Sequence, residues 1–544
     1  MSGLYAQDLL GARPIFLLTL TAAGRVWRLA SETVEVLDDN GASHLYQGQL
    51  DAPSVAESLG SLGDAPTEPG VALDGLVLDG ALDLLAEGHD LAAGRGELAV
   101  WLEGTTLEAR HVLVSGRITG PVAGLGDVVS LALGDRLGDD RGRLLAVGAV
   151  VDATTWPNAA SNAIGNPYPV VLGAPGVYTS SAGATTNTTG SPCLVVDNTG
   201  GAEVLLICDG WVGATTIRIF NTDDRTSETF SVVLTTDGNG RRVSTVSFAA
   251  AASITVDAET EYAAWWNGGG GLVGDRGEVI DGLGDAIVWA LRKSTLPIDL
   301  QGWESVRQAL NVVTIGGYID QDTTPIGWVL DTLLPLAPVS LRFGPDGLAP
   351  VLWRLDVLAG DVEAVLDLDT LAGDLALDSD GISSAGDYVS EFRLTYARRQ
   401  HRGDYKRTRT LTGRDLTTAE AATPNVIQQT AHLRSAYLAA VASTGSTQPV
   451  TDELTTDWVY DEASAGYVLG WRARLKAHPV QSITLAATWD LGWLRVGGAY
   501  LLRYPDLLRV DRIAQLEAVE LSLDGPRYTF RLLRDVARDL FTAV

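Results

Sequence analysis

The sequence has few cysteines. Its 544 residues include only Cys193 and Cys208, with no C-x-x-C and no histidine beside either of them. Neither a zinc site nor a disulfide scaffold is therefore indicated. The two residues could pair across neighbouring strands, but two buried free thiols are the favoured interpretation.

Long apolar runs are also missing. The run around Ile15–Leu20 has no basic region before it and is soon interrupted by polar and small residues, unlike a signal peptide. No stretch reaches the roughly 18 apolar residues that a membrane-spanning helix needs. We therefore expect no membrane span, and a soluble protein that is made in the cytoplasm.

Positive charge is scarce as well. Lysine and arginine number 39 against 68 acidic residues, which gives a formal net charge of −29. Such a chain repels nucleic-acid phosphates and anionic membranes, so sequence-specific DNA binding is disfavoured. The acidity serves either solubility or a functional acidic surface, and composition leaves both explanations open.

Glycine, threonine and valine, by contrast, are plentiful. The 60 glycines and the repeated turn dipeptides favour strands and hairpins, because glycine adopts positive φ and β-branched residues suit a pleated surface. The length suggests three to five domains. We predict a mainly β, multidomain α+β protein with a smaller helical part, comprising two β-barrel-like domains and an inserted β-sandwich-like unit.

The first two predicted domains consist of strands. Residues 1–155 form a β-meander typical of a barrel, with a strong hairpin signal at Asn40–Gly41. Residues 156–267 form an inserted antiparallel domain whose clearest hairpin surrounds "TDGNG". The segment "GNPYPVVLGAPG", residues 165–176, is compatible with a phosphate loop or a crossing between domains. The two flanking β regions favour a crossing out of the first barrel.

The remaining two domains are predicted from changes in periodicity. Residues 268–338 are mainly helical, because apolar residues recur every three or four positions after residue 278. Thr324 and Pro325 indicate a helix that runs to Leu334. Residues 339–544 return to strands and form a second barrel-like domain, with one helix near residues 425–443.

Three short motifs suggest ligand sites, and each has a simpler explanation. Gly269, Gly271 and Gly274 have the spacing of a dinucleotide fingerprint, but no buried parallel strand precedes them and acidic residues follow, which favours a flexible boundary. Asp378, Asp380, Gly381 and Asp387 resemble a calcium loop with a wrong first position and no final glutamate, so a turn is favoured. The Arg402-Gly403-Asp404 tripeptide lies at a predicted hairpin tip.

No catalytic signature appears. The sequence lacks G-x-S-x-G, H-E-x-x-H and P-loop motifs, and its histidines, at positions 44, 89, 111, 401, 432 and 478, do not have metal-ligand spacing. We therefore assign no catalytic, cofactor-binding or metal-binding residues, expect no cofactor and do not expect an enzyme.

The order of these features resembles one family. The phrases that carry the resemblance are "WPNAASNAIGNPYPVVLGAPG", "LVVDNTGGAEVL", "TPIGWVLDTLLPLAPVSLRFGPDGLAPVLWRLD" and "LRYPDLLRVDRIAQLEAVELSLDG". Together they are similar to the tail hub, or baseplate hub, proteins of tailed bacteriophages. The similarity covers most of the chain and rests on pattern and phrase.

The resemblance implies a structural protein of the virion. It implies a homotrimer in which two related barrels per chain adapt the sixfold tail tube to a threefold tip and line the DNA exit channel. The implied partners are the tail tube or distal tail protein, the tape measure protein, and tip, spike or fibre proteins. DNA would pass through without sequence-specific binding.

Two other functions stay open. Fourteen tryptophans and the β insertion between residues 177 and 262 are compatible with a carbohydrate-binding, receptor-binding protein of the tail tip. A cell-wall glycoside hydrolase is the third possibility, although carboxylates are too numerous for a catalytic pair to be identified from sequence.

Overall fold

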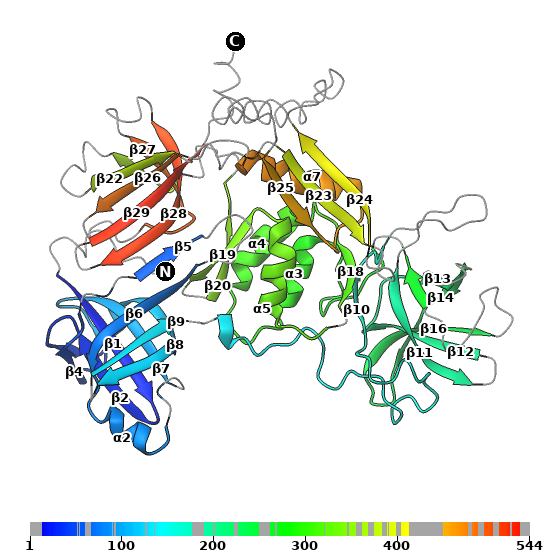
Figure 1. The fold of residues 1–544 in the computed structure, drawn as a ribbon, viewed down its shortest axis with the longest axis horizontal. Helices are drawn as coiled ribbons and strands as arrows, with labels where there is room; N and C mark the ends of the chain where they lie inside the picture. Colours follow the sequence, from blue (N-terminus) through cyan, green and yellow to red (C-terminus); the bar gives the residue numbers. More distant parts are fainter. Residues whose placement is uncertain are drawn as a thin grey trace, which may run out of the picture. The chain divides into compact units, whose positions relative to one another are not determined.

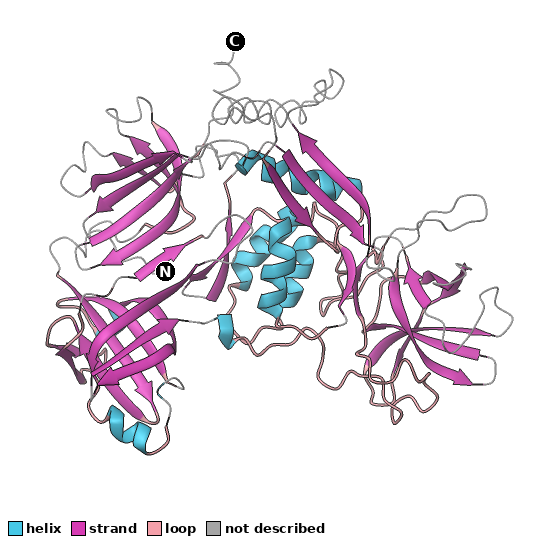
Figure 2. Ribbon diagram, viewed as in Figure 1, coloured by secondary structure: helices cyan, strands magenta, loops and turns pink. Residues whose placement is uncertain are grey.

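The chain folds into two compact units that are each assembled from separate stretches of sequence. Unit 1 comprises Met1–Asp139, Val339–Ser383 and Val480–Val544, and unit 2 comprises Asp140–Pro338 and Ser384–Pro479. The computed structural model describes residues 13–51, 53, 55–59, 67–89, 91, 94–125, 128–134, 137–176, 190–199, 202–221, 227–249, 262–266, 269–319, 321–344, 347–354, 362–367, 375–382, 389, 391–398, 404–412, 450–476, 481–487, 494–503, 511–522 and 525–533. Strands dominate these residues (Figure 2).

The N-terminal part of unit 1 is a mainly antiparallel sheet (Figure 1) whose strands do not all follow one another in chain order, so the predicted simple meander is wrong. Its first hairpin is tight because Ala23 and Gly24 adopt φ values of 47° and 80°, as a two-residue turn between twisted strands requires. The strands are β1 (Pro14–Ala22), β2 (Arg25–Ala30), β3 (Val34–Leu37), β4 (Ser43–Gly48), β5 (Val55–Ser58), β6 (Thr67–Val77), β7 (Arg95–Leu102), β8 (His111–Leu125) and β9 (Val128–Gly134). Helix α2 (Ala81–Ala86) and 3₁₀ turns at Leu107–Ala109 and Leu137–Asp139 complete this part.

Strand β1 is buried on both faces. Phe16, Leu18 and Leu20 point into the larger apolar cluster with β6 to β9. Ile15 and Leu17 belong to a second cluster that β2, β3, β4 and β7 complete. Since successive side chains of a strand point to opposite faces, the apolar run Ile15–Leu18 identifies β1 as a central strand.

The C-terminal strands of unit 1 continue the same sheet. Residues Ala518–Leu521 of β28 pair with Ser58–Val55 of β5 in antiparallel register. Fifteen of the described strands of unit 1 thereby form one sheet, in which β22, β26, β29 and β28 follow one another. The bounds are β21 (Ala364–Asp367), β22 (Leu375–Ile382), β26 (Gln481–Ala487), β27 (Ala499–Arg503), β28 (Arg512–Ser522) and β29 (Gly525–Leu532), and β19 (Val339–Gly344) and β20 (Gly347–Leu352) form a separate hairpin.

Unit 2 contains a seven-stranded sheet with the order β14-β13-β17-β11-β12-β16-β15. Cys193 and Cys208 lie in it as buried free thiols, which confirms the favoured interpretation, and burial raises the pKa of both. The strands are β11 (Ser191–Thr199), β12 (Ala202–Asp209), β13 (Thr216–Asn221), β14 (Ser227–Ser231), β15 (Val233–Thr236), β16 (Arg242–Ala249) and β17 (Tyr262–Trp265). The hairpin predicted around "TDGNG" joins β15 to β16.

The segment "GNPYPVVLGAPG" proves to be a buried strand of unit 2. Its residues Val170–Gly173 form β10, which pairs with β18 (Gly316–Ile319). The main chain of β10 also bonds outward, because Leu272 N donates to Val171 O and Gly173 N donates to Ile280 O, both at 2.8 Å. The predicted crossing out of the first barrel is therefore wrong, since the chain leaves unit 1 at Asp139 and this segment lies within unit 2.

Gly270 and Gly271, at the end of the glycine run before the helices, are buried, so the predicted flexible boundary does not include them, whereas Gly269 is exposed with open space around it. A Cβ atom on Gly271 would lie 2.2 Å from the backbone nitrogen of Gly173, and one on Gly316 would lie 1.6 Å from the carbonyl oxygen of Ala174. Gly213 N and Ala214 N donate to the carbonyl oxygens of Gly271 and Gly270. These glycines allow three stretches of backbone to touch directly.

The predicted helices are present with shifted ends. They are α3 (Leu283–Leu291), α4 (Leu300–Leu310) and α5 (Pro325–Trp328), followed by a π-helical turn (Val329–Leu333) and a 3₁₀ turn (Leu334–Leu336). Thr324 Oγ1 accepts a hydrogen bond from Gly327 N at 3.2 Å, which confirms the predicted N-cap. Helix α3 begins later than its periodicity suggests, because Val279 and Gly282 form β-bridges with Val273 and Thr314.

A three-stranded sheet and a further helix complete unit 2. The sheet has the order β24 (Tyr405–Thr412), β23 (Glu391–Arg398) and β25 (Thr451–Thr455), and α7 (Glu462–Lys476) contacts β23 and β24. The sequence did not predict α7, because its two internal glycines weaken the helical signal and its buried residues do not form one stripe. The helix predicted near residues 425–443 lies outside the described residues.

The predicted fold class is confirmed as mainly β with a smaller helical part. The stretch 339–544 supplies β19 to β22 and β26 to β29 to unit 1, whereas β23 to β25 and α7 belong to unit 2. The division into four consecutive domains differs from these two discontinuous units, and it stays a prediction.

Replacing Trp328 by Asp should prevent soluble expression. The Trp328 side chain is 7% exposed, and its ring packs edge-on against Trp458 at 5.1 Å and Trp289 at 6.3 Å. The substitution removes about 3–5 kcal/mol of packing and buries an unpaired carboxylate. Trp211→Asp is the matched control, because Trp211 is 38% exposed and lies beside Arg242. Soluble expression and circular dichroism of both variants are the readouts, and a folded Trp328→Asp protein would contradict the assignment of α5 to the core.

Gly316→Ala should lower the apparent melting temperature far more than Gly277→Ala. The added methyl group on Gly316 meets backbone atoms, which cannot move aside. At Gly277 the methyl group has open space, and the cost comes only from the positive φ of 82°, which alanine adopts less readily. We expect a cost of about 3 kcal/mol or more at Gly316 and about 1–2 kcal/mol at Gly277. Scanning fluorimetry compares the two, and equal shifts would show that the backbone approach is loose.

Candidate functional site

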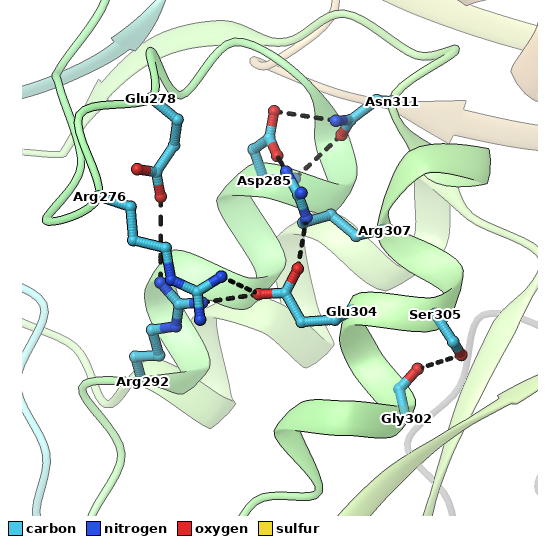
Figure 3. A network of polar contacts seen from close by, with 9 residues as sticks. All are labelled: Arg276, Glu278, Asp285, Arg292, Gly302, Glu304, Ser305, Arg307 and Asn311. Atoms are coloured by element: carbon cyan, nitrogen blue, oxygen red, sulfur yellow. Dashed lines mark hydrogen bonds and ion pairs between the residues drawn. The ribbon is translucent and has the colours of Figure 1, made fainter.

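A network of charged side chains joins helices α3 and α4 (Figure 3). The Glu304 carboxylate accepts hydrogen bonds from Arg276 at 2.8 Å, Arg292 at 2.7 Å and Arg307 at 2.8 Å. Arg292 also lies 3.9 Å from Glu278. Three arginines that converge on one carboxylate tie the two helices and the loop before α3 together.

The network continues to the N-terminus of α3. Gly282 precedes this helix and has no side chain to cap it, so Asn311 supplies the cap: its Oδ1 accepts from Asp285 N at 3.0 Å. Asn311 Nδ2 donates to Asp285 Oδ2 at 2.9 Å. A Cβ atom on Gly284 would lie 2.1 Å from Arg307 O, so the helices touch backbone to backbone where the charges meet.

The electrostatics of the network favour the ionised carboxylate. Burial raises the pKa of Glu304, but hydrogen bonding and charge from Arg307, with the charges of Arg276 and Arg292, outweigh it and hold this pKa below its ordinary value. The Glu304 carboxylate is thus bonded by three arginines, whereas Glu278 Oε2 is buried without a hydrogen-bond partner among the described residues. The arrangement therefore fastens helices together and presents no group poised for proton transfer.

A second ion cluster fixes helix α7. Arg472 is 6% exposed, and its guanidinium donates to both oxygens of Asp452 at 2.7 and 2.9 Å and to Pro335 O at 3.2 Å. Lys476 Nζ donates to the same carboxylate at 3.2 Å. Trp471 Nε1 donates to Leu336 O at 3.1 Å. These bonds hold α7 to β25 and to the 3₁₀ turn Leu334–Leu336.

Two cavities lie within unit 2. The first, of about 400 Å³, is lined by Trp265, Asp281, Thr314, Arg407 and Tyr460, among others. The second, of about 380 Å³, has Asp322, Asp331, Arg398 and the rings of Trp328 and Trp458 in its wall. In the second cavity the charges are largely paired, because Arg398 bonds Asp457 at 2.5 Å and Arg143 bonds Asp322.

The sequence motifs do not converge on either cavity. Asp378 and Asp380 lie in strand β22, where residues 375–382 pair with β26, so the predicted turn is wrong there; Asp387 lies outside the described residues. Asp404 is exposed just before β24, in the connection from β23, and Arg402 and Gly403 are not among the described residues.

The histidines are equally dispersed. His44 Nε2 lies 3.4 Å from Asp38 Oδ2, and burial lowers the pKa of His111. His401, His432 and His478 lie outside the described residues. Within the described ranges, no group of three metal-ligating side chains comes together, and no helix is both long and apolar enough to cross a bilayer.

Sequence reasoning missed the first cavity. Its lining comes from β17, the approach to α3, β18, β24 and the start of α7, which are far apart along the chain. Ala174 and Gly176 belong to the segment "GNPYPVVLGAPG", but the other lining residues belong to none of the motifs considered from sequence. Only the folded chain brings them together.

Comparison with known proteins gives distant likenesses. A tail protein from Neisseria meningitidis MC58 is 9% identical, with 96% of this chain and 97% of that chain covered and a TM-score of 0.36. A chain from the virion of a native gene transfer agent particle is 13% identical, covers 72% and 89%, and has a TM-score of 0.38. A prophage tail protein from Listeria monocytogenes EGD-e is 8% identical, covers 94% and 98%, and has a TM-score of 0.28.

No protein-family model and no curated protein matches the chain. The structural likenesses have identities no higher than 13% and TM-scores no higher than 0.38. They are too distant to carry an inference about function.

Glu304→Gln should destabilise unit 2 near neutral pH by about 1–3 kcal/mol, because it leaves three guanidinium groups facing a neutral amide. The folded pKa of Glu304 lies below the unfolded value of about 4.5, so its contribution is complete above that pH and disappears as pH falls through the folded pKa. The difference in melting temperature between wild type and variant should therefore stay constant near neutral pH and decrease only below about pH 4.5.

Glu453→Gln is the matched control for the Glu304 variant. Its carboxylate also bonds an arginine, Arg393, at 2.6 Å, but the Glu453 side chain is 61% exposed. Such a surface pair contributes about 0–1 kcal/mol. Equal effects of the two variants between pH 4 and 7 would show that the helix network contributes no more than a surface ion pair.

Proposed function

We propose that this protein is a structural component of a bacteriophage tail, a trimeric hub at its distal end. The observation that carries the proposal is the architecture of unit 1. An N-terminal and a C-terminal set of antiparallel strands share one sheet through the pairing of β5 with β28. The hub family that the sequence resembles has two related barrels per chain, and these two sets of strands supply the corresponding pair.

If the two sets of strands act as the two related barrels of a hub, each chain would supply two modules to a change of symmetry. Three chains would present six modules to the sixfold tail tube or distal tail protein, while threefold symmetry would remain for the tip, spike or fibre proteins. The tape measure protein would be a further neighbour in the tail. In this role the chain works through assembly, without catalysis.

The charge fits a channel for DNA. A net charge of −29 per chain is repeated three times around the axis of a trimer. Phosphates are held by clusters of lysine and arginine, so an acidic lining lets DNA pass without binding. Salt damps this repulsion beyond a Debye length of about 10 Å, which confines its effect to the wall of the channel.

The oligomeric state and the channel test this proposal. Three chains of 57.4 kDa should give a particle of about 172 kDa in light scattering of the free protein or once docked on the tail. A reconstruction of the virion should show three copies at the tail tip around an acidic channel. A different copy number, or a channel lined mainly by arginine, would contradict the proposal.

A further inference from the structure

The first cavity has the dimensions of a small-molecule site. Its volume of about 400 Å³ is within the usual range for ligand pockets of roughly 300–1,000 Å³. All of its lining residues belong to unit 2. Apolar and aromatic surface dominates the wall, and a few polar groups interrupt it, which is the general composition of ligand sites.

Two charged groups in the wall have no ionic partner among the described residues. Asp281 is half-buried, and burial together with the nearby charge of Asp285 raises the pKa of its carboxyl. Arg407 is exposed on β24 and bonds no carboxylate in the described part of the chain. Arg409, two residues further along the strand, does pair with Glu462 at 3.7 Å.

The fold also bonds polar groups of the cavity, including Asp281, whose carboxylate accepts a hydrogen bond from the backbone of Gly269. Thr314 Oγ1 donates to Asp461 Oδ2 at 2.6 Å, and the second oxygen of Asp461 caps α7 by accepting from Ser464 N at 2.8 Å. Trp265 Nε1 donates to Gly176 O at 3.2 Å. With its N–H satisfied, the half-buried Trp265 indole contributes an apolar surface to the wall, whereas Tyr460 is only 7% exposed.

The presence of both acidic and basic side chains in the wall disfavours a ligand that carries a single charge. A cationic ligand would satisfy Asp281 but meet repulsion from Arg407. An anionic ligand would satisfy Arg407 but face Asp281, Asp461 and Glu462, which all line the same cavity. A neutral ligand with hydroxyl groups fits both charges, because each hydroxyl can donate to a carboxylate and accept from a guanidinium.

We propose that the first cavity binds the end of a neutral oligosaccharide, with a sugar ring packed on Trp265 and adjacent hydroxyls held between Asp281 and Arg407. A pyranose ring has the required apolar C–H face and polar rim, and aromatic side chains pack well against such a face. The site includes Ala174, Gly176 and Trp265 of the predicted inserted domain, residues 156–267, and its other lining residues come from later in the chain. It does not depend on the role of the chain in a tail.

The test is direct binding of neutral trisaccharides to the full-length chain. Chitotriose, cellotriose and maltotriose are the probes, followed by saturation-transfer NMR and calorimetry at neutral pH. At least one should bind, and Asp281→Asn and Arg407→Ala should each weaken that binding about 10- to 100-fold, as expected for loss of a hydrogen bond to a charged group. Trp265→Phe keeps an aromatic ring and should weaken it less.

Lys406→Ala is the matched control, since it removes a positive charge from the same strand on the face opposite Arg407. It should leave binding unchanged, and melting curves establish that every variant is folded. The proposal would be overturned if none of the three sugars binds, or if sugar binding survives both Asp281→Asn and Arg407→Ala. It would also be overturned if hexalysine or inorganic phosphate binds in preference to the sugars. Sugar binding by a chain that never forms a trimer would support this site and count only against the tail role.

Discussion

Direct contact between backbones at glycine positions is the constraint on which unit 2 depends. Strand β10 lies among the loop of Gly271, the approach to α3 and strand β18, with no side chain between several of the approaching atoms. Gly316 N also donates to Trp458 O at 2.9 Å, which brings in the segment before α7. These backbone contacts link the seven-stranded sheet, the helices and the three-stranded sheet of unit 2. The first cavity lies next to them, because Gly316 is one of its lining residues.

Charge is used differently in the interior and at the cavity. In a chain with 68 acidic and 39 basic residues, a guanidinium readily finds a carboxylate, as Arg307 and Arg472 do. These pairs hold helices α3, α4 and α7, and removal of one member leaves a charge without its partner. Against this background an arginine without an ionic partner, such as Arg407, is a better indicator of a binding surface than the abundant acids.

The sequence predicted what local interactions determine. The hairpin at Asn40–Gly41, the strand pair around "TDGNG" and the capped helix after Thr324 were found, because turn residues and caps act within a few positions. Prediction from the sequence failed where contacts between residues far apart in the chain determine the structure. The segment that contains β10 was interpreted as a crossing out of the first barrel, and the packing of Gly270 and Gly271 was not expected. Helix α7 had no clear apolar stripe, and the cavity brings together residues that share no motif.

The pairing of β5 with β28 has a consequence for how the protein is made. These strands come from opposite ends of the sequence, and joining them closes a very long loop. During synthesis β5 emerges early, but its partner edge does not exist until the ribosome has passed residue 522. The segments of unit 2 end at Pro479, so unit 2 can fold first. Until β28 has been made, the edge of β5 that will pair with it is open to pairing with another chain, which makes that interval the stage at which misassembly can occur.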